Sequence, residues 1–376
     1  MPVNRMMIIA GEASGDMHGA KLAQSIKKMD HQSFIFGVGG SAMKAEGVQL
    51  LVDASILSVV GITEVFSNLP TIYRSMSIVK KALRQLKPNL LILIDFPDFN
   101  FHVAEFAKKL GIPILYYISP QIWAWRQGRV KKIKRLVDHM AVIFPFEAAF
   151  YRKHQVPVTF VGHPLLDRIA PVAAPVLSSD FQDAPTIGLL PGSREKEVST
   201  LLPVMLEACK KIQKVYSNAR FNVSCSDSIH ADRMMDIVNR HNADLDVDVI
   251  KGRVEQVIRN SQILVAASGT VTLEAALYGV PTVIVYKVSP TSYWLGRRLI
   301  KVKHIGIVNL IVQKSLLPEL IQDDASPENI AGKIIQMVND PRLYMQITDA
   351  LSHVRKRLGG SGASDRVARI ALNLCR

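Results

Sequence analysis

Short apolar runs alternate with longer amphipathic segments along almost the whole chain, and no Asn-Gly hairpin signal joins adjacent runs. Runs of this length are typical of buried strands, and apolar residues spaced three and four apart are typical of helices. Because a helix between successive strands makes those strands parallel, the pattern predicts an α/β fold. The predicted strands of a first sheet are 6–10, 34–38, 90–95, 113–118, 140–144 and 158–161, with helical spacing at 64–86 and 102–110.

The alternation stops at residues 167–184, where Pro, Ala and Ser with little periodicity predict a linker. We therefore expect two doubly wound α/β domains in tandem, residues 1–168 and 185–340, followed by basic helices over 341–376. Such an arrangement predicts a cleft between the domains and ligands beyond the carboxyl ends of the strands. The predicted strands of the second sheet are 186–190, 220–224, 247–250, 262–266 and 281–285.

The composition narrows the function classes. No apolar run approaches the roughly 20 residues of a membrane-spanning helix, and the run near the N-terminus is too short for a secretory signal. Three Cys without CxxC spacing argue against a disulfide framework or a cysteine zinc site, so we expect the reducing cytoplasm. The 46 Lys+Arg and 32 Asp+Glu give a net charge of +14, which favours nucleic acid, acidic lipid or a phosphorylated substrate.

A glycine-containing loop, residues 11–19, directly follows the first predicted strand. Ser14 and Asp16 have the chemistry of helix caps, and Gly15 lets the backbone approach a ligand closely. Ser14, Gly15 and Asp16 are therefore expected substrate-binding residues. The spacing is not GxGxxG, so a dinucleotide is not predicted. A plain strand-to-helix turn explains the glycines equally well, but Glu12 and Asp16 lie where catalytic groups usually lie.

A second loop, Gly192-Ser193-Arg194, follows the strand predicted at 186–190. Backbone N–H groups at a helix start, with a guanidinium beside them, suit a diphosphate. A capped helix start with a surface arginine is the structural alternative.

A third loop, Ser268-Gly269-Thr270, follows the strand predicted at 262–266 and again precedes a helix. Glu274 lies further into that helix, where a carboxylate can accept both hydroxyls of a ribose. An ordinary Ser/Thr cap with a solvated Glu is the alternative here. Two anion loops in one domain, with a carboxylate-bearing loop in the other, predict a nucleotide-diphosphate ligand, and nucleotide sugars are the obvious class.

With these loops in view, the sequence resembles the lipid-A-disaccharide synthases, which are inverting glycosyltransferases of the two-domain GT-B type. The motifs run in the family's order and together are highly specific. They are GEASGD at 11–16, GVGG at 37–40 followed by Met43, IDFPDFN at 94–100, SPQIWAWRQGRVKKIKR at 119–135, FPFE at 144–147, FVGHP at 160–164, LLPGSREKEV at 189–198, ASGTVTLEAAL at 267–277 and NLI at 309–311.

The resemblance implies a reaction. The 2,3-diacylglucosamine of UDP-2,3-diacylglucosamine moves to the 6-hydroxyl of 2,3-diacylglucosamine 1-phosphate. The products are UDP and the β(1′→6) tetraacyl disaccharide 1-phosphate of lipid A in the Gram-negative envelope. It also implies that the terminal helices pack back on the first domain or are exchanged with a second subunit in a homodimer.

Inverting transfer needs a general base for the acceptor hydroxyl. The resemblance puts weight on Asp95, with Asp98 in support and Glu12 as the rival base. A helix cap explains Asp98 as well as a catalytic role does.

The departing diphosphate needs stabilisation, and the loops at 192–194 and 268–270 have the groups for it. The resemblance places Asn309 near the nucleotide, although an Asn that ends a turn would look the same. His163 is expected to contact substrate, with a buried structural histidine as the alternative.

Trp123, Trp125 and Arg126 precede a basic segment that runs to Arg135. Tryptophans beside cations suit a membrane–water interface or the acceptor's 1-phosphate, so Trp125 and Arg126 are expected substrate-binding residues. Stacking on single-stranded nucleic acid and a plain solvated helix are the alternatives.

The acylated substrates favour an anionic membrane surface, with peripheral association at the inner membrane and no nucleic-acid partner. Apolar residues between 56 and 73 are a candidate acyl surface, with core burial as the alternative.

No metal or other cofactor is expected. Asp244, Asp246 and Asp248 alternate, but they lack the glycine and closing glutamate of a calcium loop. Two other functions remain open: a different UDP-sugar enzyme such as a 2-epimerase, and a basic nucleic-acid or membrane-binding module that retains a nucleotide pocket.

Overall fold

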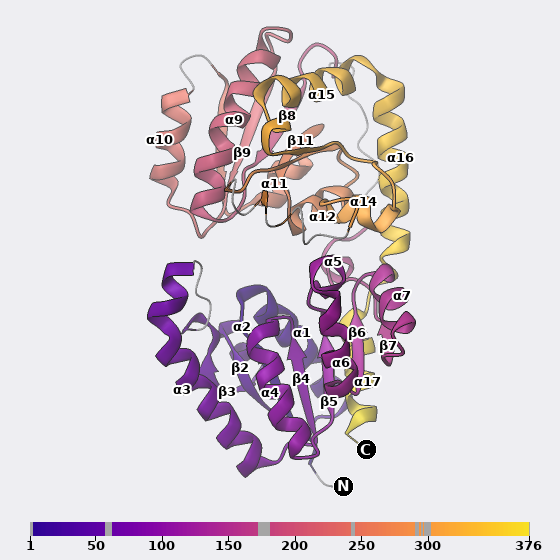
Figure 1. Cartoon of the computed structure of the whole chain (residues 1–376). Coiled ribbons are helices and arrows are strands. Elements are labelled where there is room, and N and C mark those ends of the chain that lie inside the picture. The colour runs from indigo at the N-terminus through magenta and orange to yellow at the C-terminus, as the bar shows by residue number, and fades with distance from the viewer. Residues whose placement is uncertain are drawn as a thin grey trace. The chain divides into compact units, whose positions relative to one another are not determined.

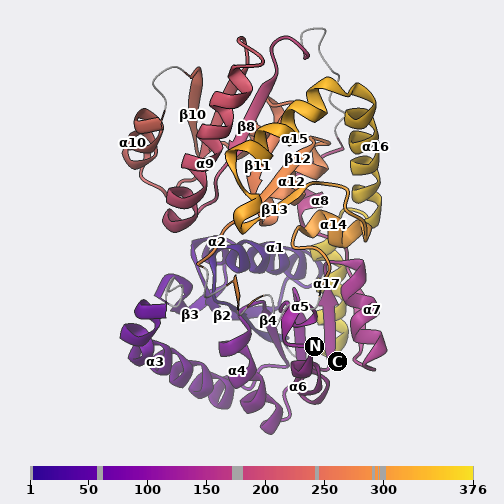
Figure 2. The same cartoon turned by 45° about the horizontal axis from the view of Figure 1, so that its top comes forward.

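The computed structural model describes residues 3–56, 62–171, 181–241, 245–289, 293–294, 296 and 302–375, of which 62–69 by their backbone only. The chain forms two compact units (Figures 1 and 2). The first contains residues 1–168 and 358–376, and the second contains residues 169–357.

The first unit is built on a parallel sheet with the strand order β3-β2-β1-β4-β5-β6-β7. Its strands are β1 (Arg5–Ala10), β2 (Phe34–Gly39), β3 (Gln49–Asp53), β4 (Leu90–Ile94), β5 (Ile114–Tyr117), β6 (His139–Val142) and β7 (Val158–Phe160). Its helices are α1 (Ala13–Met29), α2 (Ser41–Ala45), α3 (Ile62–Leu86), α4 (Pro97–Lys109), α5 (Ile122–Trp125), α6 (Val130–Leu136), α7 (Pro145–Lys153), α8 (Leu165–Arg168) and α17 (Ala363–Leu374).

Helices cover both faces of this sheet, which explains why all five residues of β4 are buried. Figure 1 shows α4 in front of the sheet and α17 behind it, where α17 packs against α1. Alternate strand residues such as Met7, Ile9, Leu91 and Leu93 belong to the core on the side of α3, α4 and α6. A parallel sheet with two covered faces therefore accounts for the short, continuously apolar runs of the sequence.

The second unit repeats the architecture with a parallel sheet ordered β10-β9-β8-β11-β12-β13. Its strands are β8 (Thr186–Leu190), β9 (Arg220–Cys225), β10 (Val247–Lys251), β11 (Ile263–Ala267), β12 (Thr282–Tyr286) and β13 (Glu319–Ile321). Its helices are α9 (Glu195–Gln213), α10 (Ala231–His241), α11 (Val254–Arg259), α12 (Thr270–Leu277), α14 (Ile307–Val312), α15 (Pro327–Asn339) and α16 (Pro341–Arg357).

The strand register brings the important loops together. Ala10 pairs with Ile94 at the end of β1 and β4, so the segments that begin at Gly11 and Asp95 leave the sheet side by side. In the second unit Leu190 pairs with Ala266, so the loops after β8 and β11 also leave as neighbours.

The predicted α/β class and the predicted strands of both sheets are confirmed. Sequence analysis missed β3 and β13, two edge strands that are short or only partly buried and therefore lack a continuous apolar run. It also began the helix α4 at residue 102, whereas Pro97 occupies its first turn, where the missing N–H of proline removes no helical bond.

The unit boundaries differ from the expected ones. Residues 341–376 were expected to pack on the first domain or to be exchanged with a second subunit, whereas α16 packs against α12, α14 and α15 in the second unit. Tyr344 of α16 donates a hydrogen bond to the carbonyl of Gln262 (3.0 Å). Phe181, in the predicted linker, packs against the Tyr344 ring at 5.0 Å between centroids, so the second unit begins before residue 185. Residues 172–180 of that linker lie outside the described residues.

Among the described residues, no helix combines the length and the apolar character needed to cross a lipid bilayer.

Candidate functional site

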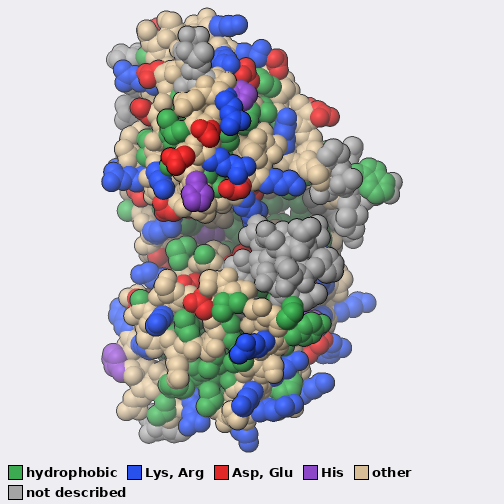
Figure 3. Space-filling model, turned by 90° about the vertical axis from the view of Figure 1, so that its left-hand side faces the viewer, with side chains coloured by type: hydrophobic (Ala, Val, Ile, Leu, Met, Phe, Trp, Pro, Cys, Tyr) green, Lys and Arg blue, Asp and Glu red, His purple; other side chains and the backbone are tan. Residues whose placement is uncertain are grey.

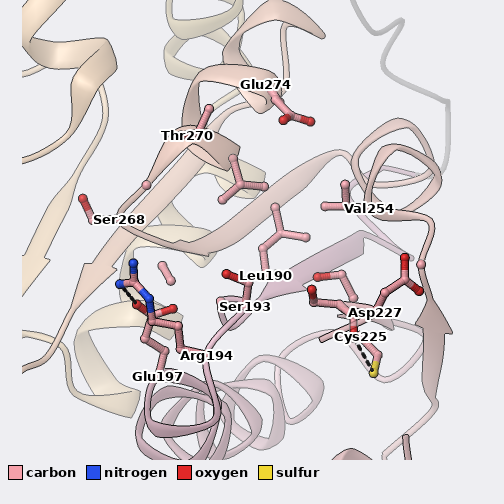
Figure 4. Close-up of a pocket in the computed structure, with 17 residues that line it drawn as sticks. Leu190, Ser193, Arg194, Glu197, Cys225, Asp227, Val254, Ser268, Thr270 and Glu274 are labelled. Carbon is pink, nitrogen blue, oxygen red and sulfur yellow. Dashed lines mark hydrogen bonds and ion pairs between the residues drawn. The ribbon is translucent and has the colours of Figure 1, made fainter. Parts of the chain in front are cut away.

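A pocket of about 450 Å³ lies at the carboxyl ends of β8, β9, β10 and β11 in the second unit (Figure 4). It is the place where an open α/β sheet usually binds ligands. Seven of the eight residues expected at a nucleotide line it: Gly192, Ser193, Arg194, Ser268, Gly269, Thr270 and Glu274. The structure therefore brings two loops that are more than 70 residues apart in the sequence to the same pocket.

The loop after β8 presents Arg194 and the start of α9. Gly192 has φ of +113°, a conformation that side chains disfavour, and a Cβ there would approach Glu197 Oε2 to 2.5 Å. Arg194 is the extended residue before α9, and its guanidinium pairs with Glu197 at 3.0 Å (Figure 4). Because the Arg194 side chain is 66% exposed, the guanidinium is accessible to a ligand in the pocket.

The loop after β11 presents the start of α12 to the same hollow. Gly269 precedes the helix in an extended conformation, and a Cβ there would meet no atom within 4 Å, which leaves room for a ligand. Thr272 donates its hydroxyl hydrogen bond to the carbonyl of Gly269 (2.8 Å), which holds this turn in place. The first N–H groups of a helix have no intrahelical acceptor. The starts of α9 and α12 therefore both offer anion-binding donors to the pocket.

Residues that sequence analysis missed complete the pocket wall. They come from the ends of β9 and β10: Ser224, Cys225, Ser226, Asp227, Gly252 and Val254. Figure 4 places Asp227 and Val254 across the pocket from Arg194. Only their position after a predicted strand could have indicated these residues, since β9 is the neighbour of β8 in the sheet and both strands end at the same edge. Among the described residues that line the pocket, the carboxylates Glu197, Asp227 and Glu274 share the wall with one cation, Arg194, so any anion must rely on backbone N–H groups as well.

Asn309 does not line this pocket, contrary to expectation. It is fully buried, and its Nδ2 donates to the carbonyl of Leu317 (2.8 Å) and to Glu319 Oε1 (2.7 Å). Its Oδ1 accepts from the N–H groups of Leu316 (3.0 Å) and Leu317 (2.9 Å). The side chain uses its hydrogen-bonding capacity to join α14 to the chain before β13, which makes it structural.

In the first unit, Asp95 follows β4 in an unusual turn. Asp95 and Phe96 both have left-handed backbones, with φ of 43° and 47°. Such a conformation costs a residue other than glycine roughly 1–2 kcal/mol. The Asp95 carbonyl accepts hydrogen bonds from the Tyr116 hydroxyl (2.6 Å) and from Asn100 Nδ2 (2.7 Å), which offset that cost.

The Asp95 carboxyl has the properties of a base that works near neutral pH. Burial and, to a smaller extent, the negative charge of Glu12 raise its pKa to about 6, while a backbone hydrogen bond from Phe96 opposes the rise. Glu12 is exposed at the N-cap of α1. The structure thus brings Glu12 and Asp95 into electrostatic contact, because β1 and β4 pair up to the residues that precede them.

Asp16, expected to bind substrate, is a helix cap instead. Its carboxylate is buried and accepts backbone N–H bonds from Gly40 (2.7 Å), Ala42 (3.0 Å) and Met43 (3.0 Å) at the start of α2. Sequence analysis expected a cap for its own helix, whereas Asp16 caps a neighbouring one. The GEASGD and GVGG motifs are therefore two halves of one structural contact.

Ser14 and Gly15 lie in the first turn of α1 rather than in the loop before it. Ser14 is exposed and so accessible to a ligand. Gly15 is buried, and a Cβ there would lie 3.3 Å from the Cβ of Ala10. Gly15 thus lets α1 pack closely on β1.

Asp98 is in the first turn of α4 and pairs with Arg129 of the basic segment at 2.9 Å. Its side chain is 78% exposed, in contrast to that of Asp95. The Trp125 ring is exposed, and the Arg126 guanidinium stacks on it with its central carbon 4.1 Å from the ring centroid.

His163 is buried, and its Nδ1 accepts a hydrogen bond from the N–H of Leu165 (3.2 Å) at the start of α8. Burial and, to a smaller extent, the neighbouring His18 lower its pKa to about 3, so the ring is neutral. The expectation of a substrate contact for His163 is thus replaced by a structural role.

Glu147, the last residue of the FPFE motif, is a buried carboxyl beneath the tryptophan segment, and the sequence indicated no role for it. Its oxygens accept hydrogen bonds from Trp123 Nε1 (3.1 Å) and from the N–H groups of Ile143 (3.2 Å) and Phe144 (3.0 Å). Burial raises the pKa of Glu147 to about 8, and these donors act in the opposite direction. The bond keeps Trp123 inside, so Trp125 is the tryptophan of this pair that is exposed.

Among the described residues, no three His, Cys, Asp or Glu side chains are placed to hold a metal ion. Asp244, part of the alternating aspartates, lies outside that set.

A profile of the lipid-A-disaccharide synthetase family matches residues 6–371. The chain belongs to this family. Lipid-A-disaccharide synthase of Geobacter metallireducens is 46% identical over 378 residues, which cover 99% of this chain and 98% of the relative. The Coxiella burnetii (strain Dugway 5J108-111) enzyme of the same name is 41% identical over 373 residues, covering 98% of each chain. The family predicted from the motifs is confirmed.

Solved structures share the fold of this family member at low identity. A UDP-GlcNAc 2-epimerase from Neisseria meningitidis bound to UDP-GlcNAc has a TM-score of 0.65 at 13% identity, over 98% of this chain and 100% of that one. A UDP complex of S. aureus MnaA has a TM-score of 0.67 at 14% identity, over 99% and 98%. These likenesses confirm the GT-B class of fold.

We expect Asp16→Ala to lower the free energy of unfolding by about 2–4 kcal/mol, because three N–H groups at α2 lose their acceptor. Asp16→Asn should cost less, since one oxygen remains to accept. Urea denaturation followed by fluorescence measures both. A raised substrate KM in Asp16→Asn without any loss of stability would contradict the capping role.

Proposed function

We propose that this chain, a glycosyltransferase of lipid A biosynthesis, transfers 2,3-diacylglucosamine from UDP-2,3-diacylglucosamine to the 6-hydroxyl of 2,3-diacylglucosamine 1-phosphate, releasing UDP. The observation that carries the proposal is the pocket of the second unit. There two helix starts and Arg194 converge on one hollow. Family membership supports the lipid substrates.

The donor's diphosphate would lie between the starts of α9 and α12, with Arg194 beside it. Backbone N–H groups that point at the same place stabilise the charge that builds on departing UDP. Glu274 would accept the ribose hydroxyls, from the side of the pocket opposite Arg194 (Figure 4). No metal is needed for this scheme, because helix dipoles and a guanidinium supply the positive charge.

Asp95 would act as the general base. An inverting transfer is a single displacement, in which the acceptor's 6-hydroxyl loses its proton as its oxygen attacks the anomeric carbon and the bond to UDP breaks. A carboxyl with a pKa of about 6 is ionised at neutral pH and still basic enough to accept that proton. Glu12 would support Asp95 by raising its pKa, and Asp98 is engaged with Arg129.

The proposal predicts UDP release only when both acylated substrates are present. Arg194→Ala should raise the donor KM about 10–100-fold, because a charge-assisted contact to the diphosphate is lost. Arg259→Ala is the matched control, since Arg259 is exposed and pairs with Glu255 outside the pocket. Turnover of unacylated UDP-GlcNAc alone would favour a 2-epimerase, the function named for one fold neighbour.

For Asp95, we expect kcat to fall about tenfold per pH unit below an apparent pKa near 6 and to level off above it, because only the ionised carboxylate accepts a proton. Asp95→Asn should lower kcat about 10²–10⁴-fold with UDP binding unchanged. A pH-rate profile and UDP titration test this. If Glu12 is the base instead, Glu12→Gln loses turnover and Asp95→Asn keeps it.

We also propose that the α3, α4 and α6 face of the first unit binds an anionic membrane surface peripherally. Lys80 and Arg84 lie over the Phe106 ring, and Arg129 and Lys132 lie over the Phe101 ring, all within 5.7 Å of the centroids. Figure 3 shows Lys and Arg side chains along the lower part of this unit, seen from the side of α3. Cations over aromatic rings suit a lipid headgroup region. The expected acyl surface, residues 56–73, falls largely outside the described side chains.

Reversal of Lys131 and Lys134 to Glu should reduce flotation with phosphatidylglycerol vesicles more than about tenfold, since each surface cation contributes about 1 kcal/mol. Both residues lie on the basic helix α6. The double reversal of Lys214 and Lys333, exposed residues of the second unit, changes the net charge equally and is the control. Equal losses in both double variants would contradict a specific face.

A further inference from the structure

We infer that Asn100 and Tyr116 are positioning residues that hold the Asp95 turn in its left-handed conformation and so aim the carboxylate at the acceptor hydroxyl. This inference rests on the proposed role of Asp95 as base. It assigns a task to two buried side chains that touch the backbone of Asp95 and need touch no substrate.

The two side chains converge on one atom. The Tyr116 hydroxyl donates to the Asp95 carbonyl at 2.6 Å from the neighbouring strand β5. Asn100 Nδ2, on the first turns of α4, donates to the same carbonyl at 2.7 Å and to that of Ile94 at 3.4 Å. Both donors therefore hydrogen-bond to the peptide group between Asp95 and Phe96, the two residues with φ of 43° and 47°.

A carbonyl oxygen can only accept, so both side chains are the donors of these hydrogen bonds. Asn100 is fully buried, and an amide turned over would direct its oxygen at two carbonyl oxygens, which repel it. Burial raises the pKa of Tyr116 well above its usual value, and the charge of Asp95 adds to the rise. Tyr116 thus stays protonated and remains a donor at every pH at which the enzyme would work.

Loss of a donor should loosen the turn without removing the base. A non-glycine residue leaves the left-handed region when nothing holds it there, and the carboxylate then moves with the backbone. Substrate affinity should persist while turnover falls.

The charged or titratable groups that act on Asp95 come from several elements: Glu12 before α1, Tyr116 of β5 and Glu147 of α7.

The test is Tyr116→Phe, with Tyr117→Phe as the matched control. Tyr117 is the next residue of β5 and equally buried, but its side chain lies on the other face of the sheet, near His18 of α1 and Ser364 of α17 and away from Asp95. We expect Tyr116→Phe to lower kcat about tenfold, the effect of one such bond in the transition state. Both KM values and the Kd for UDP should stay within about twofold. The acid limb of its pH-rate profile should move to lower pH, as the carboxyl gains solvent.

Asn100→Ala, checked for folding by circular dichroism, should lower kcat further. Wild-type kcat and an unmoved acid limb in Tyr116→Phe would overturn the inference, and so would equal losses in the two tyrosine variants. An inactive Asp95→Asn beside a fully active Tyr116→Phe would overturn only the positioning role. Full activity of Asp95→Asn would instead overturn the proposed base, and the positioning role with it.

Discussion

The structure depends on the burial of parallel strands on both faces. Strands such as β4 and β11 are buried at every residue, so each must be followed by a helix that covers the sheet. This constraint places each strand-to-helix connection at the carboxyl edge of its sheet. The candidate site residues of both units lie at those edges, where exposed backbone donors have a rigid support.

The two units use the same edge for different chemistry. In the second unit, helix starts and one guanidinium make a pocket suited to an anion, although three carboxylates share its wall. In the first unit, carboxyl groups lie at this edge. Asp95 and Glu12 interact with each other, while the Asp16 carboxylate accepts the backbone N–H groups at the start of α2. This division is the basis of the proposal that one unit holds the donor by its diphosphate and the other activates the acceptor with a base.

Sequence reasoning succeeded where a residue's role follows from its position along the chain. Arg194 and Ser268 follow apolar runs and precede helices, so their place at one sheet edge could be predicted. It failed where a side chain acts on a distant partner. Asp16 caps a helix that begins 25 residues later, and Asn309 satisfies backbone groups before β13, yet both resemble ligand-binding residues in the sequence. Glu147 stood in the FPFE motif without a role, because only the fold brings Trp123 into contact with it.

The sequence by itself determined the alternation of strands and helices, the two-unit α/β class and the family, since these follow from local apolar periodicity and motifs in order. Only the tertiary structure decided which polar side chains are free to meet a ligand. In it, the terminal helices belong to different units, and His163 and Asn309 are buried. The Asp95 turn is held by hydrogen bonds from Tyr116 and Asn100. The physical reason is that hydrogen-bond satisfaction is a property of three-dimensional neighbours, which residue type and spacing do not specify.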